Sequence, residues 1–361
     1  MSIGPVSCEQ CSQSHRCSDR RYGELFGCFD HCVDHCNKSA CNLTCPFNEP
    51  EYSRRMMEVN WRQPLRGVVP DIEAGVVPPL HLPQVFGHTN RDTPLAVPWA
   101  AVPYHRLFRE VGRRCLEPVA TSPLELRQKF MLAPDTRIAG ISSAHDIHLE
   151  RMWEYYRVTD MAAALKSMDV SFATAPNFSF WTIAPRPHNE WNFRRMALFT
   201  LRLWEGGFRM VPHVYAERDA DWLDRAAFFV DHPQLDTFAF ELQTGDAAPM
   251  HVPRLRRQMA LFLDKVGRPL RMVVSGGAGA AVWLPQVFPD LTIVEGDSYV
   301  KAIKRRQLFL LRNGKVRPCA IHTIGSVSDL LFDNIRTTGA ALEIRRARAL
   351  CQTEKIGMAA A

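Results

Sequence analysis

The chain has 361 residues and a mass of 41.0 kDa, with 46% hydrophobic and 23% charged residues, which excludes a disordered chain, a collagen and a coiled coil. No apolar run reaches the ~18 residues that a membrane span needs, and the polar start does not resemble a signal peptide, so we expect a soluble, cytoplasmic protein with no membrane partner. The net charge of +6 is a mild excess that is compatible with a nucleic-acid partner.

The cysteines are concentrated at the start of the chain. Eight of the 11 are Cys8, Cys11, Cys17, Cys28, Cys32, Cys36, Cys41 and Cys45. Because nothing in the sequence points to secretion, metal binding is favoured over a disulfide framework or reduced thiols. Zn²⁺ is the first expectation, since histidines lie among the thiols, and an iron–sulfur cluster is the alternative. We therefore predict a Cys-rich metal-binding module over residues 1–50.

Residues 51–104 connect this module to the rest of the chain. Seven prolines lie between positions 67 and 104. Proline removes a backbone donor and interrupts regular structure. The sequence therefore predicts an extended segment that wraps around the following domain.

Residues 105–361 alternate between two patterns. Short apolar runs predict strands at 137–141, 170–175, 209–215, 238–242, 271–275 and 292–295. Amphipathic stretches predict helices at 149–166, 191–205, 221–230, 252–266 and 299–311. This alternation is typical of a parallel sheet in an α/β protein. Six such units, with one or two more strands from the flanks, favour a (β/α)8 TIM-like barrel of irregular form as the catalytic domain. A doubly wound open sheet is the alternative.

Polar side chains follow the predicted strands. In a barrel the chemistry lies at the carboxyl ends of the strands. The carboxylates there include Asp146 and Glu241. The candidates for substrate binding are Asn177, Ser179, Gln243 and Ser275. The glycine-rich turn that follows, with Gly276, Gly277 and Gly279, offers backbone amides to an anion or a planar ligand.

A basic stretch follows Asp297, the carboxylate next to the last predicted strand. Seven cations and no acid lie between positions 301 and 317: Lys301, Lys304, Arg305, Arg306, Arg312, Lys315 and Arg317. Such a charge density attracts a phosphate backbone. A carboxylate beside a phosphate-binding surface favours chemistry on a nucleotide within a polymer.

The stretch RMVVSGGAGAAVWLPQVFPDLTIVEGDSYVKAIKRRQLFLLRNGKVR resembles the corresponding region of the tRNA-guanine transglycosylases. It covers about an eighth of the chain. The resemblance implies that Asp297 is the nucleophile, that the glycine turn binds the base, and that a hairpin follows the basic stretch. The DNA-modifying branch of that superfamily, the DpdA-type proteins of phages and bacteria, is similar in kind and inserts 7-deazaguanine bases into DNA.

The chain departs from that family at two places. Where the tRNA enzymes carry a general-base aspartate in an Asp-Ser-Gly-Gly-Phe-Gln segment, this chain has the sequence APNFSF, with Asn177 in place of the carboxylate. Either Asn177 only binds the base, or Asp146 or Glu241 transfers the proton. The family's C-terminal zinc ligands are absent, with only Cys319 and His322 nearby, so the N-terminal module would be a relocated metal site.

The residue types fit the exchange of a base in nucleic acid. A carboxylate can stabilise an oxocarbenium-like transition state or attack the anomeric carbon. Donors in the glycine turn would offset charge on the leaving guanine, each worth on the order of 3 kcal/mol. The target base would be flipped out, and Phe180, Trp181 and Tyr215 are candidates to stack on it.

We therefore expect a transglycosylase that exchanges guanine for a 7-deazaguanine, with DNA favoured as the polymer and tRNA as the alternative. Two alternatives stay open. One is a non-catalytic, zinc-containing nucleic-acid-binding protein, and the other is an iron–sulfur barrel enzyme of another family. The sequence is compatible with a homodimer and does not demand one.

Overall fold

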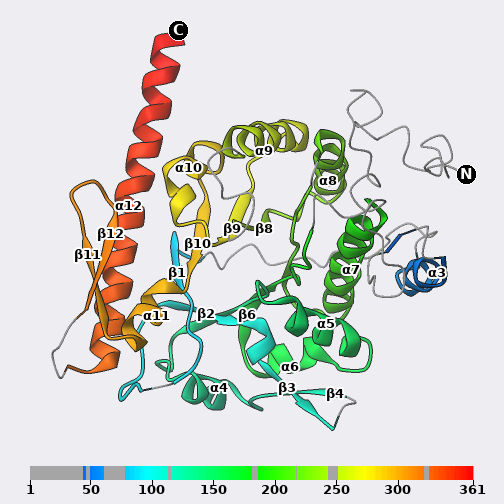
Figure 1. Cartoon of the computed structure of the whole chain (residues 1–361), viewed down its shortest axis with the longest axis horizontal. Coiled ribbons are helices and arrows are strands. Elements are labelled where there is room, and N and C mark those ends of the chain that lie inside the picture. Colours follow the sequence, from blue (N-terminus) through cyan, green and yellow to red (C-terminus); the bar gives the residue numbers. More distant parts are fainter. Residues whose placement is uncertain are drawn as a thin grey trace, which may run out of the picture.

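The computed structural model describes residues 44–45, 49–60, 78–88, 90–112, 115–180, 186–216, 218–242, 251–320 and 325–360. Seven of the eight clustered cysteines, Cys8 to Cys41, lie outside these ranges, as do Gln243 and Trp181. The described part has a mixed α/β fold in which helices surround parallel strands (Figure 1).

Two four-stranded parallel sheets form the centre of the fold. One has the order β2 (Trp99–Pro103), β5 (Arg137–Ile141), β6 (Val170–Thr174) and β7 (Met210–Val211). The other has the order β8 (Thr237–Glu241), β9 (Arg271–Ser275), β10 (Leu291–Glu295) and β1 (His81–Pro83).

Isolated parallel bridges join the two sheets at both edges. Gln84, next to β1, pairs with Ala101 of β2. His213, just after β7, pairs with Ala239 of β8, and Val214 donates its amide to the Ala239 carbonyl at 2.9 Å. The pairing therefore runs through all eight of these strands and returns to β1.

The strand sequences explain this arrangement, because both faces of each strand are buried. One face contributes to an inner cluster with side chains from every one of the eight strands: Leu82, Trp99, Ala101, Ala139, Ile141, Phe172, Val211, Ala239, Val273 and Val294. Alternate residues such as Phe238 and Phe240 belong to a larger cluster that includes helix residues. Strands buried on both faces have near-continuous apolar sequences, as these do.

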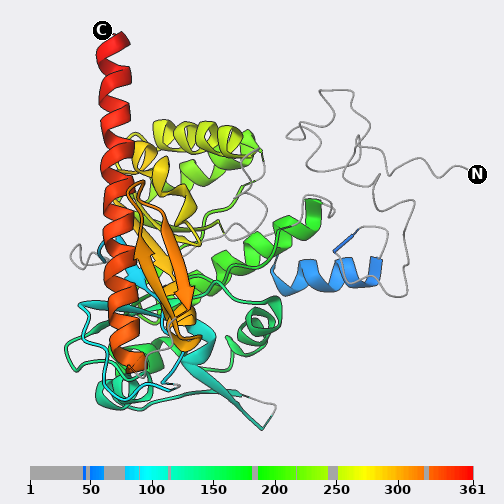
Figure 2. The same cartoon turned by 60° about the vertical axis from the view of Figure 1, so that its left-hand side comes forward.

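Helices follow most of the strands. They are α5 (Asp146–Tyr155), α6 (Met161–Ser167), α7 (Arg186–Glu205), α8 (Asp219–Asp231), α9 (Val252–Val266), α10 (Leu284–Val287) and α11 (Asp297–Ile303). Between β2 and β5 lie the hairpin β3 (Phe108–Val111) and β4 (Cys115–Pro118), and the helix α4 (Pro123–Lys129). Before β1, α3 (Glu49–Glu58) lies against α7 (Figure 2).

The six strands expected after residue 105 are all present, and the flanks supply two more, β1 and β2. Both come from the proline-rich segment 51–104, which therefore contributes two of the eight central strands. Pro83 and Pro103 are the last residues of their strands.

Two helix predictions were wrong. The stretch 149–166 forms two helices rather than one, because Asp160 caps a new helix by accepting a hydrogen bond from the Ala163 amide at 3.0 Å. In the stretch 299–311 the helix ends at Ile303. Two residues later, Arg305 adopts a left-handed φ of 53°. The chain then forms the antiparallel hairpin β11 (Arg306–Leu310) and β12 (Val316–Ala320), which the family resemblance had implied.

The long C-terminal helix α12 (Val327–Ala360) packs along this hairpin, and its end projects beyond the rest of the fold (Figure 2). The side chain of Asn334 in α12 accepts a hydrogen bond from the Leu308 amide at 2.8 Å. Near β10, Ser298 donates to Glu295 at 2.7 Å and lies 2.9 Å from the Thr338 hydroxyl. Among the helices of the described ranges, none combines the length and apolarity that crossing a bilayer requires.

Candidate functional site

Polar groups from β6 and β8 meet at the carboxyl ends of the strands. Asn177, three residues beyond β6, donates its side-chain amide to a carboxylate oxygen of Glu241, the last residue of β8. Glu241 pairs in register with Ser275, the last residue of β9, which is buried. The structure therefore brings together three of the predicted site residues.

The environment of Glu241 changes its acidity. Burial raises the pKa of this carboxyl above its usual value, the hydrogen bond from Asn177 opposes that shift, and the negative charge of Asp146 adds to it. A carboxyl group that holds its proton more firmly suits a general acid and base near neutral pH. Burial therefore favours the protonated form of Glu241, one of the two candidates for proton transfer.

Asp146 and Ser179 form a second pair at the same edge. The Ser179 hydroxyl donates to Asp146 at 2.7 Å, and the Asn192 side chain of α7 donates to the Ser179 carbonyl at the same distance. Asp146 is the first residue of α5 and is exposed. These bonds fix the loop after β6 between α5 and α7, and with it the position of Asn177.

Two of the three aromatic residues proposed for stacking lie in the described structure. Phe180 and Tyr215 are half-buried, and their ring centroids are 4.4 Å apart at an interplanar angle of 31°. Each ring already has one face against the other. Their role as a platform for an extruded base stays a prediction.

In the glycine turn after β9, backbone conformation or close packing requires glycine at two positions. Gly276 has a φ of 74°, which L side chains rarely adopt, and a Cβ atom on Gly277 would lie 2.6 Å from Cγ1 of Val274. The Gly276 amide donates to the carbonyl of Val294 in β10 at 3.4 Å, so this donor is already engaged. Gly279 is exposed and begins a short 3-10 helix, η4 (Gly279–Val282).

Asp297 lies at the carboxyl end of β10, two strands from Glu241. It is the first residue of α11 and is exposed. The neighbouring carboxylate, Glu295, is buried and bonded to Ser298. Asp297 is therefore the accessible carboxylate of the two, in a position open to solvent.

The predicted phosphate-binding residues do not share one helix. Lys301 is half-buried on α11, whereas Lys304, Arg305, Arg306 and Arg312 are exposed. The last two belong to the β11–β12 hairpin or its turn. The basic surface is thus carried mainly by the hairpin that packs on α12.

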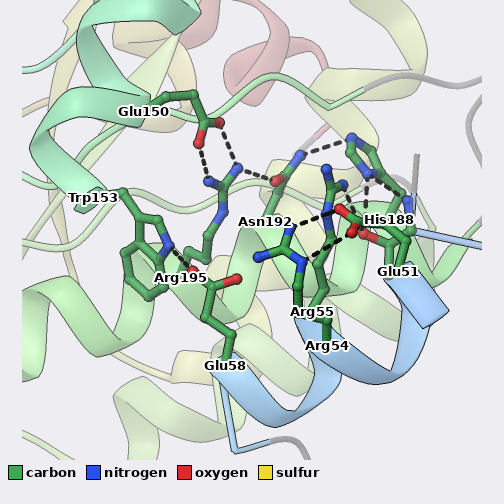
Figure 3. A network of polar contacts seen from close by, with 10 residues as sticks. Glu51, Arg54, Arg55, Glu58, Glu150, Trp153, His188, Asn192 and Arg195 are labelled. Carbon is green, nitrogen blue, oxygen red and sulfur yellow. Dashed lines mark hydrogen bonds and ion pairs between the residues drawn. The ribbon is translucent and has the colours of Figure 1, made fainter. Parts of the chain in front are cut away.

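Sequence reasoning missed a buried arginine close to the site. Arg195 of α7 is 2% exposed, and its guanidinium lies 3.8 Å from the Phe178 ring centroid and 3.6 Å from that of Trp191. It donates twice to Glu150, at 2.6 and 2.9 Å, and once to Asn192 at 2.5 Å (Figure 3). The sequence signal that could have pointed to this contact is the spacing of Trp191 and Arg195, four residues apart on one helix.

The same network reaches the residue before Cys45. Thr44 is buried, and its amide donates to Nδ1 of His188 in α7 at 3.2 Å. Burial, helped by the charges of Arg55 and Arg195, lowers the pKa of His188 to about 4, so the ring is a neutral acceptor. The Arg55 side chain of α3 donates to the Thr44 hydroxyl at 3.2 Å. The chain leaving the cysteine cluster is therefore anchored on α7.

The metal prediction falls mostly outside the described residues. Cys45 is half-buried and lies within them, while the other seven clustered cysteines do not. Within the described ranges, no group of three or more His, Cys, Asp or Glu side chains is arranged to hold a metal ion. The zinc site, like its iron–sulfur alternative, stays a prediction.

Comparisons with known proteins add little. No family model and no curated protein matches the chain. One similar solved structure is a mutant GH128 (subgroup I) endo-beta-1,3-glucanase from Amycolatopsis mediterranei in complex with laminarihexaose. It is 11% identical, with 57% of this chain and 88% of that chain covered and a TM-score of 0.31. A likeness of that size carries no argument here.

Proposed function

We propose that the chain is a transglycosylase that exchanges guanine for a 7-deazaguanine base in nucleic acid, with DNA as the favoured polymer. We also propose that its eight parallel strands form one closed (β/α)8 barrel. Two observations support closure of the barrel: the bridges at both sheet edges, and the inner cluster to which every strand contributes a side chain. The proposed site then lies at the carboxyl mouth of the barrel, where such enzymes act.

The observation that carries the proposal is the Asn177–Glu241 contact. Asn177 stands at the nearest equivalent of a carboxylate in the tRNA-guanine transglycosylases, which part of the sequence resembles, and an amide cannot take up a proton. Here it donates to a carboxylate that arrives from another strand end, and burial raises the pKa of that carboxylate. Glu241 can therefore supply the proton transfer that Asn177 cannot.

In the proposed reaction, the Asp297 carboxylate attacks the anomeric carbon as the glycosidic C–N bond breaks. Protonated Glu241 gives its proton to the departing guanine and is left ionised. The incoming 7-deazaguanine returns a proton to Glu241 as its ring nitrogen attacks the same carbon. The Asp297 carboxylate is then released, and both carboxyl groups regain their starting states.

The test measures incorporation of labelled guanine into duplex DNA and into tRNA. Asp297→Asn is expected to lower the exchange rate by about a thousandfold or more, since it removes the nucleophile. Glu241→Gln is expected to lower it by about a hundredfold or more, the usual contribution of a general acid and base. The matched control is Asp290→Asn, an exposed aspartate just before the amino end of the same strand, β10. Full exchange by the Asp297 variant would exclude this mechanism.

A non-catalytic nucleic-acid-binding protein is the second candidate. The exposed position of Asp297 and the basic hairpin favour it. It predicts tight binding of DNA that the Asp297→Asn variant retains in full, together with no exchange of guanine by the unaltered chain.

A further inference from the structure

A large cavity lies among the β11–β12 turn, η4 and α12, and Gly279 of the glycine turn is one of its lining residues. Its volume is about 530 Å³, within the range of cavities that hold small molecules. The polar side chains that line it are Asn313, Lys315, Arg345 and Arg348. No acidic residue is among its lining residues, so the cavity presents three positive charges without a carboxylate.

The two arginines are fixed by neutral groups. Arg345 donates from Nε to the Gly314 carbonyl at 2.9 Å and from Nη1 to the Ala278 carbonyl at 2.6 Å. Arg348 donates to the carbonyls of Asn313 and Arg312, at 2.7 and 3.0 Å. Carbonyl oxygens orient a guanidinium but leave its charge uncompensated.

Each guanidinium keeps donors for a ligand. A guanidinium carries five N–H groups, and the bonds above occupy two on each arginine. Lys315 is exposed beside them and adds three N–H donors. Fixed, forked donors with uncompensated positive charge are what recognition of a phosphate group requires.

We propose that this cavity binds backbone phosphates of the nucleic-acid substrate. The choice of a polymer over a free anion rests on the proposed function and on the hairpin turn, where the exposed Arg312 adjoins the lining residue Asn313. The site would hold the polymer against α12 while the target base enters the mouth of the strands.

The experiment measures binding of a fluorescent 20-bp DNA duplex by anisotropy over a series of KCl concentrations. We compare the unaltered chain with Lys315→Ala and with Lys315→Ala combined with Arg348→Ala. Loss of one phosphate contact should reduce the slope of log K against log salt by about 0.9, which is about eightfold in Kd at 0.1 M salt. The double variant should lose about twice that slope. The control, Lys265→Ala, removes an exposed charge in the last turn of α9 and should leave the slope unchanged.

Three outcomes would overturn the proposal. One is an unchanged salt slope in both variants, and another is an equal loss in the Lys265 control. The third is displacement of the duplex by micromolar pyrophosphate or mononucleotide from the unaltered chain but not from the double variant, which would identify a small anion as the ligand. Guanine exchange on the same proteins separates this proposal from the proposed function. A reduced slope with no exchange by the unaltered chain would support the phosphate site and remove the transglycosylase.

Discussion

Arg195→Lys is expected to destabilise the folded chain although it keeps the positive charge. The guanidinium lies between the rings of Phe178 and Trp191 and is 2% exposed. A lysine ammonium cannot stack flat on both rings or bond to Glu150 and Asn192 together. Buried contacts of a cation with a ring reach about 2 kcal/mol each, and a neutral hydrogen bond contributes about 1 kcal/mol.

The expected loss is therefore about 2–4 kcal/mol, because lysine retains part of the ring contact. Loss of the second hydrogen bond to Glu150 adds little to the destabilisation, since that carboxylate is 50% exposed and water can take the place of the lost donor. Such a loss is a large fraction of the stability of a typical domain, which is about 5–15 kcal/mol.

The assay is urea unfolding followed by tryptophan fluorescence, with midpoints and slopes compared. The matched control is Arg202→Lys on the same helix, where the side chain is 57% exposed and lies 3.8 Å from Glu205. Its change should stay below about 0.5 kcal/mol. Glu150→Gln should cost clearly less than Arg195→Lys. Equal losses in those two variants would show that the ion pair, and not the contacts with the two rings, holds the arginine, and would refute the reasoning.

Two further predictions concern stability near the site. Burial raises the pKa of Glu241, so this carboxyl stabilises the fold at a pH below the ordinary carboxyl pKa, and that contribution is lost as pH rises through the folded-state pKa. In thermal unfolding, Glu241→Gln should therefore gain stability relative to the unaltered chain as pH rises above the ordinary carboxyl pKa of 4.5; a gain that shrinks with rising pH would contradict this. Gly277→Ala should destabilise the chain by about 1–3 kcal/mol, because its Cβ would lie 2.6 Å from Val274, whereas Gly279→Ala meets nothing within 4 Å and should be nearly neutral in the same unfolding assay.

Local patterns were enough to place most of the repeating elements. Apolar runs such as 271–275 and 137–141 coincide with β9 and β5, and the amphipathic stretch 252–266 coincides with α9. These elements are decided by the burial of residues close in the chain, which the hydrophobic period reports directly. The sequence also placed polar residues at strand ends, and the structure has Glu241 and Ser275 paired there.

Other features depend on residues that are far apart in the chain. Arg306–Leu310 forms a strand because β12 and α12 are there to pair with it and cover it, while its own pattern continues that of a helix. The contact of Asn177 with Glu241 joins positions 64 residues apart, and no local pattern selects that partner. The position of Arg195 between two rings likewise needs α7 and the loop after β6 to be packed together. Local sequence patterns thus set the order of strands and helices and put polar residues at the strand ends. Tertiary packing decided which of those polar residues meet, because their contacts follow from topology and burial rather than from spacing along the chain.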